Sequence, residues 1–246
     1  MALREELEAS GNWLFRWRGY LPLLLLVVVL AGFRGSHYPA RNHGFDGGWE
    51  IMCLLLALAG LAVRVTTVGF VPHGTSGRNT TGQKAASLNT TGMYSIARHP
   101  LYLGNYLMWL ALAAFPRLWW PPVLVTLVFW LYYERIMFAE EEFLRRKFGA
   151  EFLAWAVRTP AFWPRPGLWR PPLHPFCLRT VIRREHSSLL ALVSALTAFE
   201  AASGLAAGGR LTIDPLWGAL FVTTAALSLT VRLLKHRTRV LRVPGR

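Results

Sequence analysis

Charged residues are scarce in this sequence, and acidic residues are the scarcer of the two signs. Of 246 residues, 16% are charged and 53% are hydrophobic. A typical soluble domain carries about 25% charged residues. The shortage of groups that face water argues against an ordinary soluble protein, and the high hydrophobicity excludes a disordered chain. The composition therefore favours a protein of the lipid bilayer.

Cysteine is also scarce, and its placement argues against a disulfide framework. Cys53 lies inside an apolar run and Cys177 in a basic segment, so we expect two free thiols. No Cys/His cluster has the spacing of zinc ligands, and we expect no metal site.

The charge that is present is strongly one-sided, with 27 Lys and Arg residues against 13 Asp and Glu residues, a net charge of +14. A basic balance can indicate nucleic acid binding, but here the cations border apolar segments. Such placement fits anionic lipid headgroups better. We therefore expect membrane lipids as partners and no nucleic acid.

Several apolar runs are candidates for membrane crossing. They are Tyr20–Phe33, Trp49–Val71, Pro100–Phe115, Leu118–Phe138, Ser187–Gly208 and Pro215–Leu234. A spanning helix needs about 20 residues, and the shorter runs span only where flanking Arg and Trp side chains reach the interface. The sequence predicts an all-α integral membrane protein, a polytopic helical bundle with about six transmembrane helices and at least four.

The distribution of cations predicts the orientation. With a cytoplasmic N-terminus and six crossings, the outside loops hold Arg34, Arg41, Arg117 and Arg210, and the remaining cations lie inside or near the cytoplasmic helix ends. This asymmetry is the one that the positive-inside rule requires. We expect both termini in the cytoplasm and the protein in a bacterial inner membrane.

One polar cluster surrounds the start of the helix expected at Pro100. Proline suits the first helical turn, and from there Tyr102 and Asn105 share one face. Arg98 and His99 then lie at the positive end of the helix, a position suited to a carboxylate or a phosphate. The same pattern also fits a plain helix start with interfacial anchors.

A second polar cluster is the run Glu140-Glu141-Glu142. Three adjacent carboxylates cannot all face the same way on a helix. Either they form a solvated face that balances Arg145–Lys147, or Glu140 or Glu141 turns inward to meet a cationic ligand. The proline-rich turn Pro116–Pro122 makes an antiparallel hairpin of the flanking helices, so the two clusters can converge at one membrane face. A pocket with both charges suits S-adenosylmethionine, which carries a carboxylate, an ammonium and a sulfonium.

At these residues the sequence resembles the isoprenylcysteine carboxyl methyltransferases and the phospholipid methyltransferase-like integral membrane enzymes. Their pattern is R-H-P-x-Y-x-G, then a hairpin, then E-E-x-x-L-x-x-x-F-G, an aromatic pair and a final x-P. Arg98–Gly104 match the first part and Glu140–Gly149 the second. Phe152 and Trp155 stand where the family usually has tyrosines, and Pro164 closes the motif.

The resemblance implies an S-adenosylmethionine-dependent methyltransferase that binds its cofactor from the cytoplasm and takes a lipid or prenylated acceptor through a lateral opening. It implies that Arg98, His99, Tyr102 and Gly104 line the cofactor pocket, across from Glu140 and Glu141. Asn105 joins this set by its helical spacing from Tyr102.

The resemblance also divides the chain into three parts. Residues 1–91 hold N-terminal transmembrane helices and a polar cytoplasmic connector. Gly74–Asn89 of this connector lies outside the motif, and its position just before Arg98 suggests a lid over the cofactor. Residues 92–164 form the methyltransferase-like cofactor-binding hairpin and a cytoplasmic helix. Residues 165–246 form a basic linker and two C-terminal transmembrane helices, which lie outside the motif.

Methyl transfer from a sulfonium is an in-line displacement, so the protein mainly positions and desolvates the reactants. Burying a cationic cofactor requires carboxylates, a role for Glu140 and Glu141. A carboxylate acceptor needs no base, whereas for an amine or a hydroxyl His99 and Glu141 are the candidate bases. Arg158 is a candidate anchor for an anionic acceptor, and equally for the membrane surface.

Two further ionisable residues interrupt the apolar runs. We expect Arg64 to extend to the cytoplasmic surface. Glu200 is either a site residue, as intramembrane carboxylates often are, or a protonated group, or the partner of Arg210.

Two alternative functions are kept open. An NADPH-dependent membrane reductase of the sterol-reductase type would share the helical layout, but paired glutamates are poor neighbours for the phosphates of the cofactor. A non-catalytic scaffold or a transporter is the other alternative, although a transporter should show inverted repeats or broken helices.

Overall fold

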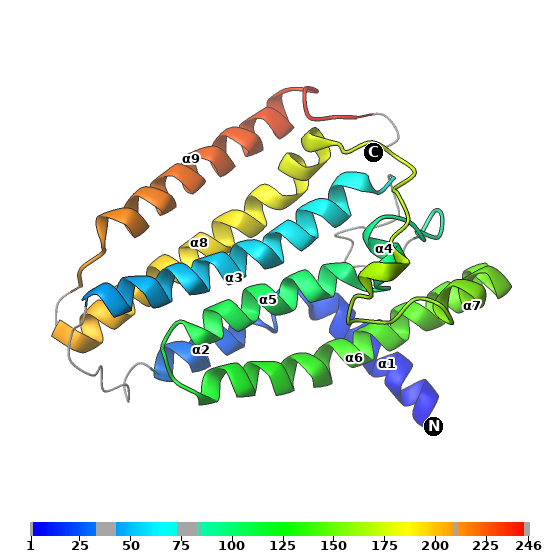
Figure 1. Ribbon diagram of the computed structural model, residues 1–246, viewed down its shortest axis with the longest axis horizontal. Coiled ribbons are helices and arrows are strands. Elements are labelled where there is room, and N and C mark those ends of the chain that lie inside the picture. The colour runs from blue at the N-terminus through cyan, green and yellow to red at the C-terminus, as the bar shows by residue number, and fades with distance from the viewer. Residues whose placement is uncertain (1, 33–42, 73–82, 84, 209–210, 244–246) are drawn as a thin grey trace.

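The computed structural model describes residues 2–32, 43–72, 83, 85–208 and 211–243. Within these ranges the regular structure is entirely helical (Figure 1). The α-helices, in chain order, are α1 (Leu3–Trp17), α2 (Leu23–Gly32), α3 (His43–Phe70), α4 (Met93–Ile96), α5 (Pro100–Ala114), α6 (Trp120–Phe148), α7 (Ala150–Ala156), α8 (Leu178–Gly208) and α9 (Pro215–Arg237). A short 3₁₀ turn, η2, covers Pro166–Leu168.

Four of these helices are long and apolar enough to cross a bilayer. The candidate spans are Gly47–Phe70, Trp120–Phe148, Leu178–Leu205 and Pro215–Arg237. The all-α integral membrane bundle predicted from the sequence is therefore confirmed. The other two expected crossings form α2 and α5, of 10 and 15 residues. At 1.5 Å per residue these helices are about 15 and 22 Å long, shorter than the hydrocarbon core of about 30 Å.

The long helices pack side by side around α3 (Figure 1). Helix α3 contacts both α5 and α8, α9 packs on α8, and α1 packs along α6. Helix α1 begins, and α9 ends, at the same end of the bundle as α7, which we call the α7 end. The turn between α5 and α6 lies at the opposite end.

Two glycines bring α3 and α5 into backbone contact. A Cβ atom built on Gly60 of α3 would lie 2.6 Å from the carbonyl oxygen of Gly104 on α5, and one built on Gly104 would lie 2.7 Å from the carbonyl oxygen of Gly60. Real side chains do not approach so closely, so the crossing depends on small residues, as is common between membrane helices. Gly11 plays the same part where α1 crosses α6 at the Arg135 carbonyl.

The hairpin predicted around Pro116–Pro122 is formed by α5 and α6. Arg117 in the turn has a positive φ of 61°, and α6 begins with prolines in its first turn. Helix α6 then continues through the acidic cluster and ends at Phe148, and the next residue, Gly149, has a positive φ of 52°, which favours glycine. The acidic cluster thus lies on the same continuous helix that spans the membrane.

Candidate functional site

The Arg98-His99 segment is held in place by the chain that follows α7. The backbone N–H of Arg98 donates to the carbonyl of Pro160 at 2.8 Å, and that of His99 donates to the carbonyl of Ala161 at 3.0 Å. These bonds fix the segment just before α5 begins at Pro100. The motif is therefore positioned by residues some 60 positions further along the chain.

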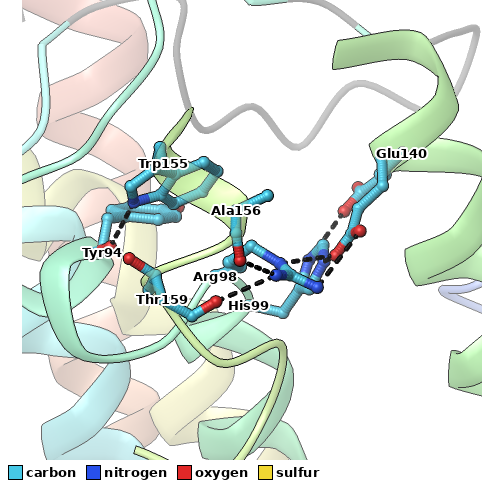
Figure 2. A network of polar contacts seen from close by, with 8 residues as sticks. Tyr94, Arg98, His99, Glu140, Trp155, Ala156 and Thr159 are labelled. Atoms are coloured by element: carbon cyan, nitrogen blue, oxygen red, sulfur yellow. Dashed lines mark hydrogen bonds and ion pairs between the residues drawn. The ribbon is translucent and has the colours of Figure 1, made fainter. Parts of the chain in front are cut away.

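The Arg98 side chain joins α6 to the end of α7 (Figure 2). Its Nε and Nη2 atoms donate to the two carboxylate oxygens of Glu141 at 2.9 and 3.3 Å. Its Nη1 atom donates to the carbonyls of Ala156 and Thr159 at 2.6 and 2.9 Å. Charge-assisted bidentate pairs of this kind are strong and directional. Arg98 is thus rigidly oriented before any ligand binds.

The imidazole of His99 lies between two carboxylates. Its Nε2 atom is 3.0 Å from an oxygen of Glu141, and its Nδ1 atom is 3.5 Å from an oxygen of Glu140. Burial by itself lowers the pKa of His99, but the hydrogen bonds and negative charges of Glu140 and Glu141 outweigh it, and the pKa is raised. The protonated imidazolium, with both ring nitrogens donating, is therefore the favoured form.

The three adjacent glutamates of α6 face three different partners. Glu140 accepts a hydrogen bond from the hydroxyl of Tyr102 at 2.7 Å and lies 3.9 Å from Arg18. Glu141 bonds Arg98 and His99, and Glu142, which is almost fully buried, pairs with Arg4 of α1. Glu140 and Glu141 therefore both turn toward the start of α5, but of these two only Glu140 lines a cavity.

That cavity has a volume of about 940 Å³ and is polar at one end and apolar in its depth. The polar lining includes Arg98, His99, Tyr102, Asn105 and Glu140. The apolar lining comes from Leu23 and Leu26 of α2, Met108 and Leu112 of α5, and Leu192 of α8. A ligand pocket commonly measures about 300–1,000 Å³, so this cavity can hold one large ligand or parts of two.

The expected lid falls largely outside the described residues, which omit 73–82 and 84. Of the remainder of the connector, Gln83, Ala85, Ser87, Leu88 and Asn89 line the cavity. This stretch therefore contributes one wall of the site.

Of the other residues predicted for the site, Asn105 lines the cavity, whereas Gly104 and Arg158 do not. The side-chain oxygen of Asn105 accepts from Arg64 at 2.6 Å, and the side-chain nitrogen is 3.4 Å from the Tyr133 hydroxyl. Gly104 lies at the α3–α5 contact and is not among the residues that line the cavity. Arg158, in the turn after α7, is exposed and donates to the carbonyl of Ala154. It is also absent from the lining.

Of the aromatic pair of the motif, Trp155 lines the cavity and Phe152 packs against Trp155. Trp155 donates its indole N–H to the carbonyl of Tyr94 at 3.1 Å (Figure 2). Phe152 is buried, and its ring centroid lies 5.9 Å from that of Trp155. The indole therefore supplies a polar contact at a position where the family usually has a tyrosine.

Sequence reasoning missed the part of the site contributed by Arg64 and Glu185. Instead of extending to the surface, Arg64 donates to both oxygens of Glu185 on α8 at 2.9 Å each. A guanidinium this deep in an apolar helix requires a carboxylate partner, and 121 residues separate the two in sequence. No local pattern connects them.

Glu200 lies far from this cluster, near the start of α9. One of its oxygens accepts from the backbone N–H of Asp214 at 3.2 Å, and the other is buried without a hydrogen-bond partner. Arg210, its expected partner, lies outside the described residues. Among the residues that the structure does place, no group of three or more His, Cys, Asp and Glu side chains could hold a metal ion.

Comparison with known proteins agrees with this architecture. Residues 49–151 match the family described as phospholipid methyltransferase, and the chain belongs to this family of membrane methyltransferases. The chain is 36% identical over 163 residues to the cobalt-zinc-cadmium resistance protein CzcN of Cupriavidus metallidurans, covering 66% of this chain and 71% of the relative. No solved structure matches the chain significantly.

A second relative is the nickel-cobalt-cadmium resistance protein NccN of Alcaligenes xylosoxydans. It is 36% identical over 174 residues, which cover 69% of this chain and 76% of the relative. The family match spans α3 to the start of α7 and includes both polar clusters, but it ends before α8 and α9. The last two helices therefore require an explanation of their own.

Proposed function

We propose that the protein is an S-adenosylmethionine-dependent methyltransferase that acts on a lipid or prenylated acceptor at the cytoplasmic face of a bacterial inner membrane. The observation that carries the proposal is the convergence of Glu140 with Arg98, His99 and Tyr102 at the polar end of a large cavity. This convergence joins two motif halves that lie on different helices of the hairpin.

The cavity lining fits the charge pattern of S-adenosylmethionine. Glu140 supplies the negative charge that a sulfonium or an ammonium requires, and Arg98 and His99 supply the positive charge that a carboxylate requires. When bound, this cofactor supplies a methyl group on a positively charged sulfur. The lining residues hold it, orient it and exclude water from it.

Glu141 acts as a positioning residue. Both of its oxygens are bonded within the protein, to Arg98 and His99, and it does not line the cavity. Because the raised pKa of His99 favours the protonated form, this imidazole is poorly suited to accept a proton. For an amine or hydroxyl acceptor, the cavity-lining carboxylate of Glu140 is the base that we propose.

A second cavity favours an acceptor with an apolar chain. It measures about 260 Å³ and is lined by residues of α2, α5 and α6, including Leu25, Val125 and Phe129. It shares Trp109 and Tyr133 with the larger cavity. An apolar chain gains about 0.8 kcal/mol for each CH₂ group that it buries, so a lipid or prenyl tail would be held well beside the polar site.

The cytoplasmic orientation rests on the positions of the cations. Arg145, Arg146, Lys147 and Arg158 cluster around the end of α6 and α7, whereas Arg117 lies in the turn at the opposite end. The positive-inside rule then assigns the α7 end, and with it the polar end of the cavity, to the cytoplasm.

The test is ligand binding by the full chain in detergent, measured as a shift in thermal stability. S-adenosylhomocysteine at about 100 times its dissociation constant should stabilise the protein by about 2.7 kcal/mol. Glu140→Gln should need at least ten times more ligand for the same stabilisation. Glu151→Gln, on the exposed side of α7, should need no more than the wild type. Radiolabelled methyl transfer into a membrane lipid extract then reports the reaction.

Three outcomes would count against the proposal. Stabilisation by NADPH alone would indicate a reductase, and no stabilisation by either ligand of well-folded protein would favour a scaffold. Stabilisation by S-adenosylhomocysteine that survives equally in Glu140→Gln would remove the residue on which the cofactor fit depends.

A further inference from the structure

One face of α8 forms a wall of the large cavity, although α8 lies outside the matched part of the family. The residues concerned recur every three to four positions, as one face of a helix requires. They include Thr180, Arg183, Arg184, Ser187, Ser188 and Leu192. This wall is polar and basic near the start of the helix and becomes apolar further along it.

The position of α8 is tied to the hairpin that carries the motif. Glu185, almost fully buried, accepts both bonds from Arg64, and the same guanidinium donates to Asn105 of α5. His186 in turn lies 3.0 Å from the Ser228 hydroxyl of α9. The basic wall of α8 is therefore fixed relative to the polar end of the cavity.

The charged groups that line the cavity are unbalanced. Among the lining residues that the structure places there are five arginines, at positions 18, 64, 98, 183 and 184, and two glutamates, Glu140 and Glu185. The protonated form of His99 adds one positive charge, and Glu141, which lies behind the lining and bonds both Arg98 and His99, adds one negative charge. The positive groups therefore still outnumber the carboxylates. A bound S-adenosyl cofactor is itself positive overall, so it does not correct the imbalance. A ligand that fills the remaining space should carry negative charge.

Tyr94 and Arg184 line the same cavity, and charges from both the motif and α8 act on the Tyr94 hydroxyl. Burial raises the pKa of its hydroxyl and the charge of Glu140 raises it further, while the charges of Arg184 and Arg64 lower it. One buried group therefore lies within the field of both Glu140 and Arg184.

We infer that Arg183 and Arg184 bind the anionic headgroup, a phosphate or a carboxylate, of an amphiphilic methyl acceptor. Arginine is well suited to both groups because its planar guanidinium bonds two oxygens at once. The apolar chain of the acceptor would extend past Leu192 and Leu26 into the depth of the cavity. That this ligand is the methyl acceptor rests on the proposed function, whereas the existence of an anion site does not. This assignment gives the α8–α9 hairpin a role in substrate selection.

The same inference replaces Arg158 as the candidate anchor of an anionic acceptor. Arg158 was expected as the anchor of an anionic acceptor, but its side chain is exposed and does not line the cavity. The α8 arginines are partly buried and line it directly. An anion bound in the cavity can therefore contact the α8 arginines but not Arg158.

The experiment measures binding of dioctanoyl phosphatidic acid to the full chain in a neutral detergent, with dioctanoylglycerol as the uncharged analogue. We expect the wild type to bind the anionic lipid at least tenfold more tightly. Arg183→Gln/Arg184→Gln should lose this preference while keeping its affinity for S-adenosylhomocysteine. Arg179→Gln/Arg232→Gln removes two exposed arginines from α8 and α9 that do not line the cavity, and should retain the preference.

Further arms identify the source of the anion. Inorganic phosphate that competes as strongly as the lipid would overturn the lipid headgroup, and octanoate that binds as tightly as phosphatidic acid would assign the site to carboxylates. An unchanged lipid preference in the double variant would overturn the anion site. Should that variant fail to fold, Arg183→Lys/Arg184→Lys keeps the charge, and a preference undiminished by loss of the planar guanidinium would count against bidentate binding. A wild type that binds the lipid but not S-adenosylhomocysteine would overturn the methyltransferase and leave the anion site standing.

Discussion

The imidazole Nε2 of His99 lies 3.0 Å from the same carboxylate oxygen of Glu141 that accepts the Arg98 Nε–H, across 42 residues of sequence. One oxygen therefore holds two consecutive residues of the α5 start against α6. The contact closes the hairpin at its polar end, where the cavity begins.

Replacing Glu141 with glutamine should loosen this closure. The amide keeps the shape but loses the charge that both partners bond, and a charged hydrogen bond of this kind contributes about 1.5–3 kcal/mol. We expect lower stability by an amount in this range, measured by denaturant or thermal unfolding in detergent. Glu151→Gln on α7 is the matched control, because that side chain is exposed. Equal effects of the two variants would contradict the positioning role of Glu141.

The raised pKa of His99 predicts a pH dependence of stability with a definite sign. The folded protein binds this proton more tightly than the unfolded chain, in which the histidine pKa is about 6.5. The contribution is thus fully present below that pH and is lost as the pH rises through the folded value. His99→Gln should flatten the stability profile between neutral and alkaline pH, measured as melting temperature against pH. A wild-type profile that rises through this range would contradict the prediction.

The Arg64–Glu185 pair should be costly to break from one side. Both side chains are largely buried, with exposed fractions of 14% and 5%. Removing Arg64 takes away the two charged hydrogen bonds that the buried Glu185 accepts from it, and breaking a buried pair from one side costs about 3–5 kcal/mol. We expect Arg64→Met to destabilise by about this much and Arg64→Met/Glu185→Leu to destabilise less than the sum of the single variants. Strictly additive effects in this double-mutant cycle would show that the pair is not coupled.

The glycine contact between α3 and α5 predicts a purely steric effect. The Cβ of Gly104→Ala would lie 2.6 Å from the Arg64 Cγ and 2.7 Å from the Gly60 carbonyl oxygen. Forcing the two helices apart should cost about 1–3 kcal/mol and displace Asn105, the next residue along. Gly48→Ala on α3 meets nothing within 4 Å and is the control. A Gly104→Ala protein as stable as the control would mean that the helices tolerate a wider spacing.

Much of the fold could be predicted from the sequence because its signals are local. Long apolar runs define the spanning helices, and the prolines of Pro116–Pro122 define the hairpin. The hairpin alone makes the Arg98 and Glu140 clusters neighbours. The run Pro100–Phe115 matches α5 to within one residue, whereas the run that begins at Tyr20 is longer than α2 because Tyr20–Pro22 form a turn before the helix.

The sequence by itself determined the helical class, the hairpin and the two polar clusters, because each depends on residues that are near neighbours along the chain. Only the tertiary structure decided which glutamate faces the cavity. Consecutive side chains on a helix point about 100° apart, so packing of α1 and α5 against α6 selects Glu140. The tertiary structure likewise paired Arg64 with Glu185 and placed the basic face of α8 on the cavity. These side chains are oriented by packing against helices that are far away in sequence.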